Sequence, residues 1–283
     1  MQKAFDVSGP VELDIRLTAG EIEVDANLDG RVEIELVALD EESQALVDGA
    51  RIELYERGGG RPQIVVDVPK KRGGGFSLGM IFGNQGISCR IRCPEGSDVQ
   101  TRTKSADLEA RGTIGSLNVA TASGDVEVDD VTGNVNVKSA SGDVSAREVG
   151  GAVNVNSASG DVSIEVVRGP INVNTASGDV TVGAADDNVN VNTVSGDHAL
   201  SAVLKGRVAA HSVSGDVTVA IRRGSRVYLD CSTVSGDTHS DLEVGSEEPD
   251  GDGPLVEVRA KTVSGDIHIT RAPAPMDTQE VHA

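Results

Sequence analysis

The sequence predicts an all-β protein, a parallel β-helix or flattened β-solenoid, and three observations support this fold class. The tripeptide Ser-Gly-Asp recurs eight times, with its serines at positions 123, 141, 159, 177, 195, 214, 235 and 264. Apolar and polar residues alternate on both sides of each copy. Hydrophobic residues make up 38% of the 283 positions, whereas aromatic residues make up 2%. A short unit repeated at a fixed period is typical of a stacked fold, here with an aliphatic interior.

The repeat unit is eighteen residues long in the central part of the chain. Counted from Ser105, which opens a degenerate Ser-Ala-Asp copy, the serine spacings are 18, 18, 18, 18, 18, 19, 21 and 29. The early turns are therefore uniform, and we expect the extra residues of the later turns to form outward loops.

The strand before each Ser-Gly-Asp has two apolar columns. Six residues before the serine stand Leu117, Val135, Val153, Ile171, Val189, Val208, Leu229 and Val258. Four residues before it stand Val119, Val137, Val155, Val173, Val191, Ala210, Cys231 and Ala260. The position between these columns is asparagine in five copies, at 118, 136, 154, 172 and 190. Such alternation predicts a strand with one buried face.

The strand after each Ser-Gly-Asp repeats this alternation, with inward positions at Val126, Val144, Val162, Val180 and Val217. His198 stands in the same inward column. We expect it to be a hydrogen-bonded or partly exposed histidine near a distorted turn rather than a catalyst.

Parallel stacking of equivalent strands explains why the columns are so similar. Strands about 4.8 Å apart would join their apolar faces into one core and exchange backbone hydrogen bonds between turns. An antiparallel sandwich is the alternative, but it would place no premium on identical columns. The columns therefore favour the solenoid.

The chain divides into three predicted regions. Residues 1–98 form an N-terminal β cap region with a degenerate repeat at 18–24, residues 99–271 form the solenoid repeats, and residues 272–283 form a disordered tail. Within the cap, strands are expected at 32–37, 51–55, 64–68 and 87–93, and a short helix near 41–49. Such a cap would cover strand edges that otherwise promote aggregation.

The net charge and the pattern of targeting signals limit the function and the location that we expect. The net charge of −20 disfavours nucleic acid, because no basic stripe exists to neutralise phosphates. The first residues lack the apolar region of a signal peptide, and no run of eighteen apolar residues occurs, so a cytoplasmic location is expected. Cys89 and Cys93 lie four apart on one predicted strand, roughly 13 Å, too far for a disulfide. We expect both thiols to be buried.

An aspartate column is the first candidate site. Stacking would align Asp107, Asp125, Asp143, Asp161, Asp179, Asp197, Asp216, Asp237 and Asp266. Carboxylates about 5 Å apart repel one another, and either Ca²⁺ or hydrogen bonds from nearby amides would relieve the repulsion. The spacing does not match the nine-residue pattern of calcium-binding β-rolls.

Two histidines form the second candidate site. His239 and His268 occupy the same outward column on successive turns, with Asp237 and Asp266 close by. These four residues could bind a transition metal, and two solvated surface histidines are the alternative reading.

The third candidate site is a glycine-rich loop at residues 70–86. Three basic residues and three glycines precede its apolar residues, which are Phe76, Leu78, Met80, Ile81 and Phe82. Such a loop would either dock on a membrane or a partner protein, or fold back as a cap over the end of the solenoid.

Enzymatic activity is not expected. Many β-helices cleave acidic polysaccharides, but this chain has no tryptophan, and its tyrosines are Tyr55 and Tyr228 alone. No serine lies in a Gly-x-Ser-x-Gly context. A carbohydrate-binding or carbohydrate-active β-helix protein remains the alternative function.

The repeats resemble a bacterial family described as a "putative adhesin" domain and as the toast-rack β-strand repeat. The resemblance rests on Thr-Ala-Ser-Gly-Asp-Val at 121 and 175, Ser-Ala-Ser-Gly-Asp-Val at 139 and 157, and Thr-Val-Ser-Gly-Asp at 193, 233 and 262. It covers at least residues 99–270, the short copy at Thr18 indicates that it reaches toward the N-terminus, and it implies a solenoid without defined catalytic residues. The description as an adhesin implies surface display. Some members of the family carry membrane segments and look like accessory proteins of membrane-stress signalling.

The expected function is therefore that of a non-catalytic β-solenoid scaffold that binds a protein partner or self-associates. The resemblance adds an accessory role in envelope-stress signalling. Peripheral membrane contact would be made through the loop at residues 70–86, and no cofactor is required unless Ca²⁺ occupies the aspartate column.

Overall fold

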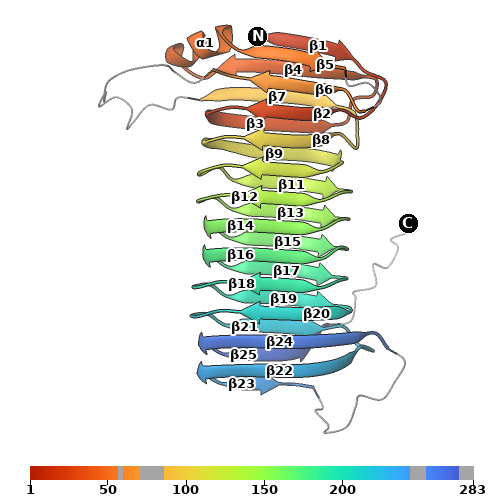
Figure 1. Ribbon diagram of the computed structural model, residues 1–283, viewed down its shortest axis with the longest axis vertical. Coiled ribbons are helices and arrows are strands. Elements are labelled where there is room, and N and C mark those ends of the chain that lie inside the picture. The colour runs from red at the N-terminus through yellow and green to blue at the C-terminus, as the bar shows by residue number, and fades with distance from the viewer. Residues whose placement is uncertain (57–59, 70–85, 243–252, 274–283) are drawn as a thin grey trace, which may run out of the picture.

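Two long β-sheets face each other, and the chain winds between them over most of its length (Figure 1). The computed structural model describes residues 1–56, 60–69, 86–242 and 253–273. Adjacent strands within each sheet are parallel over most of the stack. The predicted β-solenoid, the toast-rack architecture, is confirmed.

Within the described residues, the first sheet, called sheet A, contains thirteen strands. In spatial order they are β1 (Gln2–Asp6), β4 (Arg31–Ala38), β7 (Ile87–Cys93), β3 (Ala19–Ala26), β9 (Ser105–Ile114), β11 (Val126–Val131), β13 (Val144–Val149), β15 (Val162–Val167), β17 (Val180–Ala185), β19 (His198–Val203), β21 (Val217–Ile221), β25 (Ile267–Arg271) and β23 (Thr238–Ser240).

The second sheet, called sheet B, contains twelve strands in the part of the chain that the structure describes. In spatial order they are β22 (Arg226–Ser235), β24 (Leu255–Ser264), β20 (Gly206–His211), β18 (Val189–Asn192), β16 (Ile171–Ser177), β14 (Val153–Ser159), β12 (Val135–Lys138), β10 (Leu117–Ala120), β8 (Asp98–Arg102), β2 (Glu12–Arg16), β6 (Gln63–Asp67) and β5 (Arg51–Tyr55).

One rung of the solenoid consists of a strand in sheet B, a Ser-Gly-Asp corner and the following strand in sheet A. Strand β12 and strand β13, for example, form one rung around the corner at residues 141–143. Neighbouring rungs pair in register, so that Val135 lies beside Val153 and Val144 beside Val162. The two columns predicted from the sequence are therefore columns in space.

The core lies between the sheets and is aliphatic. Val137, Val155 and Val173 succeed one another in one column, and each is fully buried. Burial of apolar surface contributes about 25 cal/mol per Å², so each rung adds its own share of stabilisation. A rung gains this stabilisation only where neighbouring rungs cover its apolar side chains, so the stack is stable as a whole and not rung by rung.

Glycine is required at the Ser-Gly-Asp corner for two reasons. Gly160 has a φ of +124°, which side-chain-bearing residues rarely adopt. A Cβ atom there would also lie 2.2 Å from the carbonyl oxygen of Gly142 in the preceding rung. The corner backbones therefore stack in direct contact, and any larger residue would force the rungs apart.

The N-terminal end of the stack is closed by a different kind of structure. Strands β1, β4 and β5 pair antiparallel to their neighbours, and α1 (Glu41–Asp48) packs beside β4. The Asp40 carboxylate caps α1 by accepting a hydrogen bond from the Ser43 amide at 2.7 Å. The four strands and the helix expected within residues 1–98 are confirmed, with ends shifted by at most one residue.

The order of the rungs departs from the sequence at both ends of the stack. The β2–β3 rung lies between the β6–β7 rung and the β8–β9 rung. The β24–β25 rung lies between the β20–β21 rung and the β22–β23 rung. These two rungs therefore do not follow chain order, and the copy at Ser235 ends the stack.

The two sheets continue without interruption through residues 98 and 99, where the sequence placed the start of the regular repeats. At the other end, Ala272 is buried, and its amide donates to the carbonyl oxygen of Ile221 at 2.9 Å. The predicted tail lies outside the described residues from position 274 onward.

Candidate functional sites

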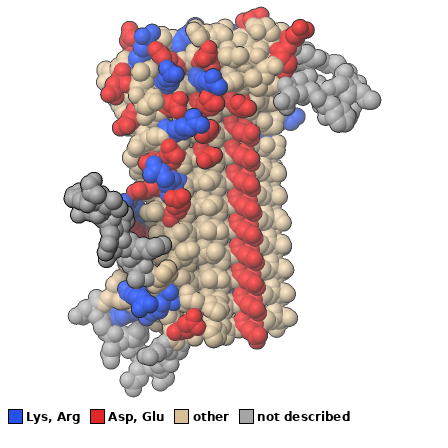
Figure 2. Space-filling view, turned by 180° about the vertical axis from the view of Figure 1, so that it is seen from behind, with Lys and Arg blue, Asp and Glu red and all other residues tan. Residues whose placement is uncertain are grey.

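The aspartate column is a continuous hydrogen-bonded ladder along one edge of the stack. The Asp179 amide donates to Oδ1 of Asp161 at 2.8 Å, and the Asp161 amide donates to Oδ1 of Asp143 at 2.8 Å. The same bond joins every neighbouring pair from Asp107 to Asp237. Figure 2 shows a stripe of acidic side chains running along the stack. Amides of the next rung therefore stabilise these carboxylates, and Ca²⁺ binding along the column stays a prediction.

The aspartate ladder also records the order of the rungs. The Asp266 amide donates to Oδ1 of Asp216, and the Asp237 amide donates to Oδ1 of Asp266. Asp266 thus lies between Asp216 and Asp237, in agreement with the position of the β24–β25 rung.

His239 and His268 lie side by side at the C-terminal end of sheet A. They are directly paired on β23 and β25, and their ring centroids are 4.9 Å apart. Both side chains are exposed. The structure thus brings together the two histidines that the sequence placed in one column.

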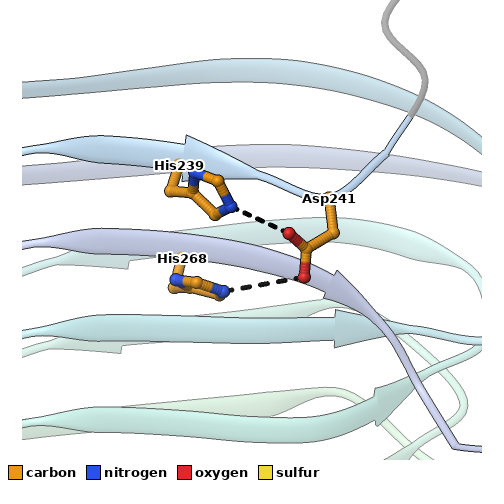
Figure 3. Close-up of side chains that lie close together, drawn as sticks. All are labelled: His239, Asp241 and His268. Carbon is orange, nitrogen blue, oxygen red and sulfur yellow. Dashed lines mark hydrogen bonds and ion pairs between the residues drawn. The ribbon is translucent and has the colours of Figure 1, made fainter.

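The third member of this group is Asp241, which the sequence analysis did not select. His239 Nε2 lies 2.8 Å from Oδ1 of Asp241, and His268 Nε2 lies 3.7 Å from Oδ2 (Figure 3). The Asp241 amide donates to the carbonyl oxygen of Ile269 at 3.0 Å, which holds this residue against β25. All three ligand atoms lie within 4.8 Å of one another.

The other two predicted ligands have a different place. Oδ1 of Asp266 accepts the Asp237 amide, so both residues belong to the aspartate ladder. Among the residues that the structure describes, the group with metal-binding spacing is His239, Asp241 and His268, without Asp237 or Asp266. Asp241 follows the last short strand directly, where no repeat column could indicate its position.

His198 is buried in the core and hydrogen-bonded, which agrees with the first of the two expected alternatives and not with partial exposure. Its Nε2 lies 2.8 Å from Thr193 Oγ1, and its Nδ1 has no hydrogen-bond partner among the described residues. Burial lowers the pKa of the imidazole to about 4, against a smaller opposing effect of the Asp197 charge. A neutral imidazole therefore takes the place that valine has in the neighbouring rungs.

Cys89 and Cys93 are buried free thiols, as the sequence predicted. Burial raises the pKa of the Cys89 thiol to about 12 and that of the Cys93 thiol to about 11. Both remain protonated thiols and act as small apolar residues of the core.

The apolar loop residues Phe76, Leu78, Met80, Ile81 and Phe82 lie outside the described residues. Within the part of the chain that is described, no helix has the length and apolar content needed to cross a bilayer.

The C-terminal end of the stack leaves two strands at the edges of the sheets. Strand β22 pairs with β24 on one side, and β23 pairs with β25 on one side. The inward residues Val227 and Leu229 of β22 are only partly buried, whereas Val256 and Val258 of β24 are fully buried. Outward-facing Tyr228 is 55% exposed.

Comparison with solved structures finds distant matches along nearly the whole chain. A "putative adhesin" from Parabacteroides distasonis is 12% identical, with a TM-score of 0.49, and the match covers 95% of this chain and 96% of that one. A "putative adhesin" from Bacteroides fragilis is 13% identical, with a TM-score of 0.46 and coverage of 95% and 96%. A "putative lipid binding protein" from Parabacteroides distasonis is 15% identical, with a TM-score of 0.44 and coverage of 96% of each chain. Comparison with curated proteins finds no match.

The family assignment comes from the sequence of the repeats together with the two flanking ends. The family model described as Toastrack DUF4097 matches residues 11–270. This range begins just before β2 and ends within β25, so it includes every rung of the solenoid. The chain is a member of the Toastrack DUF4097 family.

Proposed function

We propose that this protein is a non-catalytic β-solenoid scaffold that joins end to end with a second copy of itself through β22 and β23. The observation that carries this proposal is the difference between the two ends of the stack. Among the described residues, the outermost strands at both ends, β1 and β5 at one end and β22 and β23 at the other, have one unpaired edge each. At the N-terminal end α1 packs beside β4 and Ile52 of β5 is fully buried, whereas Val227 and Leu229 of β22 are only partly buried.

The outer surface supports a scaffold because its repeated polar groups are bound to one another. The aspartates form the ladder between rungs. On sheet B, Asn136 Nδ2 donates to Oδ1 of Asn118 at 3.1 Å, and Asn190 Nδ2 donates to Oδ1 of Asn172 at 2.8 Å. Side chains held in this way stiffen the surface, and most of their hydrogen bonds are made within the protein rather than with a ligand.

Strand β22 has the properties of an edge that accepts another strand. Natural proteins commonly protect exposed edges with lysine or proline, and β22 contains neither. Its inward residues Val227 and Leu229 are only partly covered, and Val234 is 83% exposed. A second strand added here would complete the backbone hydrogen bonds and cover these side chains.

The residues of β22 fit antiparallel pairing with the same strand of a second copy. If the two strands meet at Tyr228, Arg226 stands opposite Asp230 of the second copy, and Val227 stands opposite its Leu229. Such a pair has a two-fold axis at Tyr228, so the contact between opposite charges and the contact between apolar side chains each occur twice. This self-complementarity favours a second copy over an unrelated partner.

Sedimentation equilibrium over a range of protein concentrations tests the proposal. We expect the wild-type chain to form a dimer, and Arg226→Glu to weaken association by roughly tenfold or more, since it places two negative charges opposite each other twice. The double variant Arg226→Glu/Asp230→Arg should restore the dimer.

A variant of the glycine-rich loop, Phe76→Ser/Phe82→Ser, is the matched control and should associate like the wild type. A wild-type chain that stays monomeric at every concentration would contradict the proposal. So would a dimer that dissociates on changing the loop and not on changing Arg226.

A further inference from the structure

We propose that His239, Asp241 and His268 form a binding site for one divalent transition-metal ion such as Zn²⁺. This site lies within a single chain and does not depend on association between copies. Two imidazoles and one carboxylate, with a water completing the coordination, are a recurrent ligand set for Zn²⁺ and for other first-row divalent metals.

The positions of the three ligand atoms suit this coordination. In a tetrahedral site with ligands about 2.0–2.2 Å from the metal, the ligand atoms lie roughly 3.3–3.6 Å from one another. The two Nε2–carboxylate separations, 2.8 Å and 3.7 Å, lie on either side of this range. All three atoms are within 4.8 Å of one another and belong to exposed side chains, so small rotations would bring them to coordinating distance.

The backbone fixes the frame of the site before any ion binds. The pairing of β23 with β25 sets His239 beside His268. The bond from the Asp241 amide to the Ile269 carbonyl oxygen places the carboxylate where both Nε2 atoms approach it (Figure 3). A framework in place before binding lowers the entropy cost of binding.

The chemistry of the ligands sets the choice of metal. Imidazole nitrogens favour Zn²⁺, Cu²⁺, Ni²⁺ and Co²⁺, whereas Mg²⁺ and Ca²⁺ prefer a shell of oxygen atoms. The net charge of −20 attracts any cation to the protein, but only the imidazoles provide this discrimination. We therefore expect Zn²⁺ to bind here and Mg²⁺ not to compete with it.

Calorimetric titration of the chelator-treated protein with ZnCl₂ tests the proposal, and Co²⁺ absorption reports the ligand set. We expect one site per chain, and His239→Gln, His268→Gln and Asp241→Asn should each weaken Zn²⁺ binding by roughly tenfold or more, the loss that even an outer-shell substitution gives. Asp237→Asn and Asp266→Asn are matched controls that should bind Zn²⁺ like the wild type.

Hydrogen exchange provides a second readout that does not rely on the variants. Because the ion would tie β23 to β25, Zn²⁺ should slow amide exchange in Thr238–Ser240 of the wild type and leave the middle of the stack unchanged. The same titration on Arg226→Glu should give unchanged Zn²⁺ affinity, which separates this site from association.

Absence of Zn²⁺ binding by the wild type would overturn the proposal, and it would mean that both imidazoles hydrogen-bond to Asp241 without an ion. Unchanged affinity in Asp241→Asn or His268→Gln would also overturn it. Loss of binding in Asp237→Asn or Asp266→Asn would move the site to the aspartate ladder.

Discussion

His198 stands at an inward position where the rungs on either side have valine. It pairs in register with Val180 and Val217, and its ring is buried, with no partner for Nδ1 in the described part of the chain. Burying a polar nitrogen without a partner costs free energy, and charging the buried ring costs more. This single residue therefore makes the stability of the core depend on pH.

We expect His198→Val to remove an acid-sensitive part of the stability. The folded pKa is about 4, below the ordinary 6.5, so the unfolded chain binds a proton that the folded chain does not. The contribution to stability is complete above about pH 6.5 and is lost as the pH falls toward about 4, by up to roughly 3 kcal/mol.

Urea unfolding at about pH 7 and about pH 4.5 measures the effect, as the difference between His198→Val and the wild type. The variant should lose less stability between the two pH values than the wild type does. His268→Gln, with chelator present, is the exposed-histidine control and should follow the wild type. Equal acid sensitivity in His198→Val and the wild type would show that the ring is already protonated or exposed.

At the scale of the strands, the β24–β25 rung is an interior rung although it is the last one in the chain. Val256 of β24 pairs in register with Val227 of β22. Val256 is fully buried, whereas Val227 is partly buried. The two residues share one column and one side-chain type, and they differ in whether another rung covers them.

This pair provides a direct test of the rung order. Val256→Thr places a hydroxyl in a covered core position and should lower the free energy of unfolding by about 1–3 kcal/mol, and Val227→Thr should cost less than about 1 kcal/mol. Urea titration of both variants gives the comparison. If the rungs stacked in chain order, Val227 would be the covered residue, and the larger loss would fall on Val227→Thr.

Much of this level of structure could be predicted from the sequence. Period and alternation located the strands, the corners and the inward columns, because each depends on a local pattern. Which rung lies next to which could not be predicted in the same way, because rungs with near-identical columns can stack on one another in many orders. One feature of the sequence does indicate the order. Thr238 and Ser240 occupy inward columns that hold Ile267 and Ile269 in the copy at Ser264, and a rung with polar inward residues is expected at the exposed end of the stack.

The candidate metal site was predictable only in part, for the same reason. His239 and His268 occupy one repeat column, so the register alone brought them together. Asp241 lies beyond the end of β23, and its position depends on a backbone bond to Ile269. Repeat alignment carries no information about a residue that leaves the repeat.

At the scale of the whole molecule, the aspartate ladder sets nine like charges along one edge. Neighbouring strands are about 4.8 Å apart, so adjacent carboxylates repel one another even in water. Each carboxylate except the last also accepts an amide bond from the next rung. Each pair of neighbouring aspartates is thus joined by a hydrogen bond and repelled by like charge, and added salt weakens the repulsion.

We expect NaCl to raise the melting temperature, because near 1 M salt the screening length of about 3 Å is shorter than the strand spacing. CaCl₂ at matched ionic strength should give the same rise, since the amides already stabilise the carboxylates. Scanning calorimetry with NaCl, CaCl₂ and chelator makes the comparison. A clearly larger rise with CaCl₂ would show instead that the ladder binds calcium.

The out-of-order rungs have a consequence for how the chain is completed during synthesis. Strands β2 and β3 emerge early, yet both faces of their rung are covered only after residues as far as β9 have been made. At the other end, β22 and β23 leave the ribosome before the segment that separates them from β21. Strands β24 and β25 must therefore enter between strands that were made before them, so the stack does not grow only by adding each new rung to its end. Once they are in place, β24 and β25 are paired with neighbouring strands on both sides, so unfolding cannot begin by peeling either of them from the edge of a sheet.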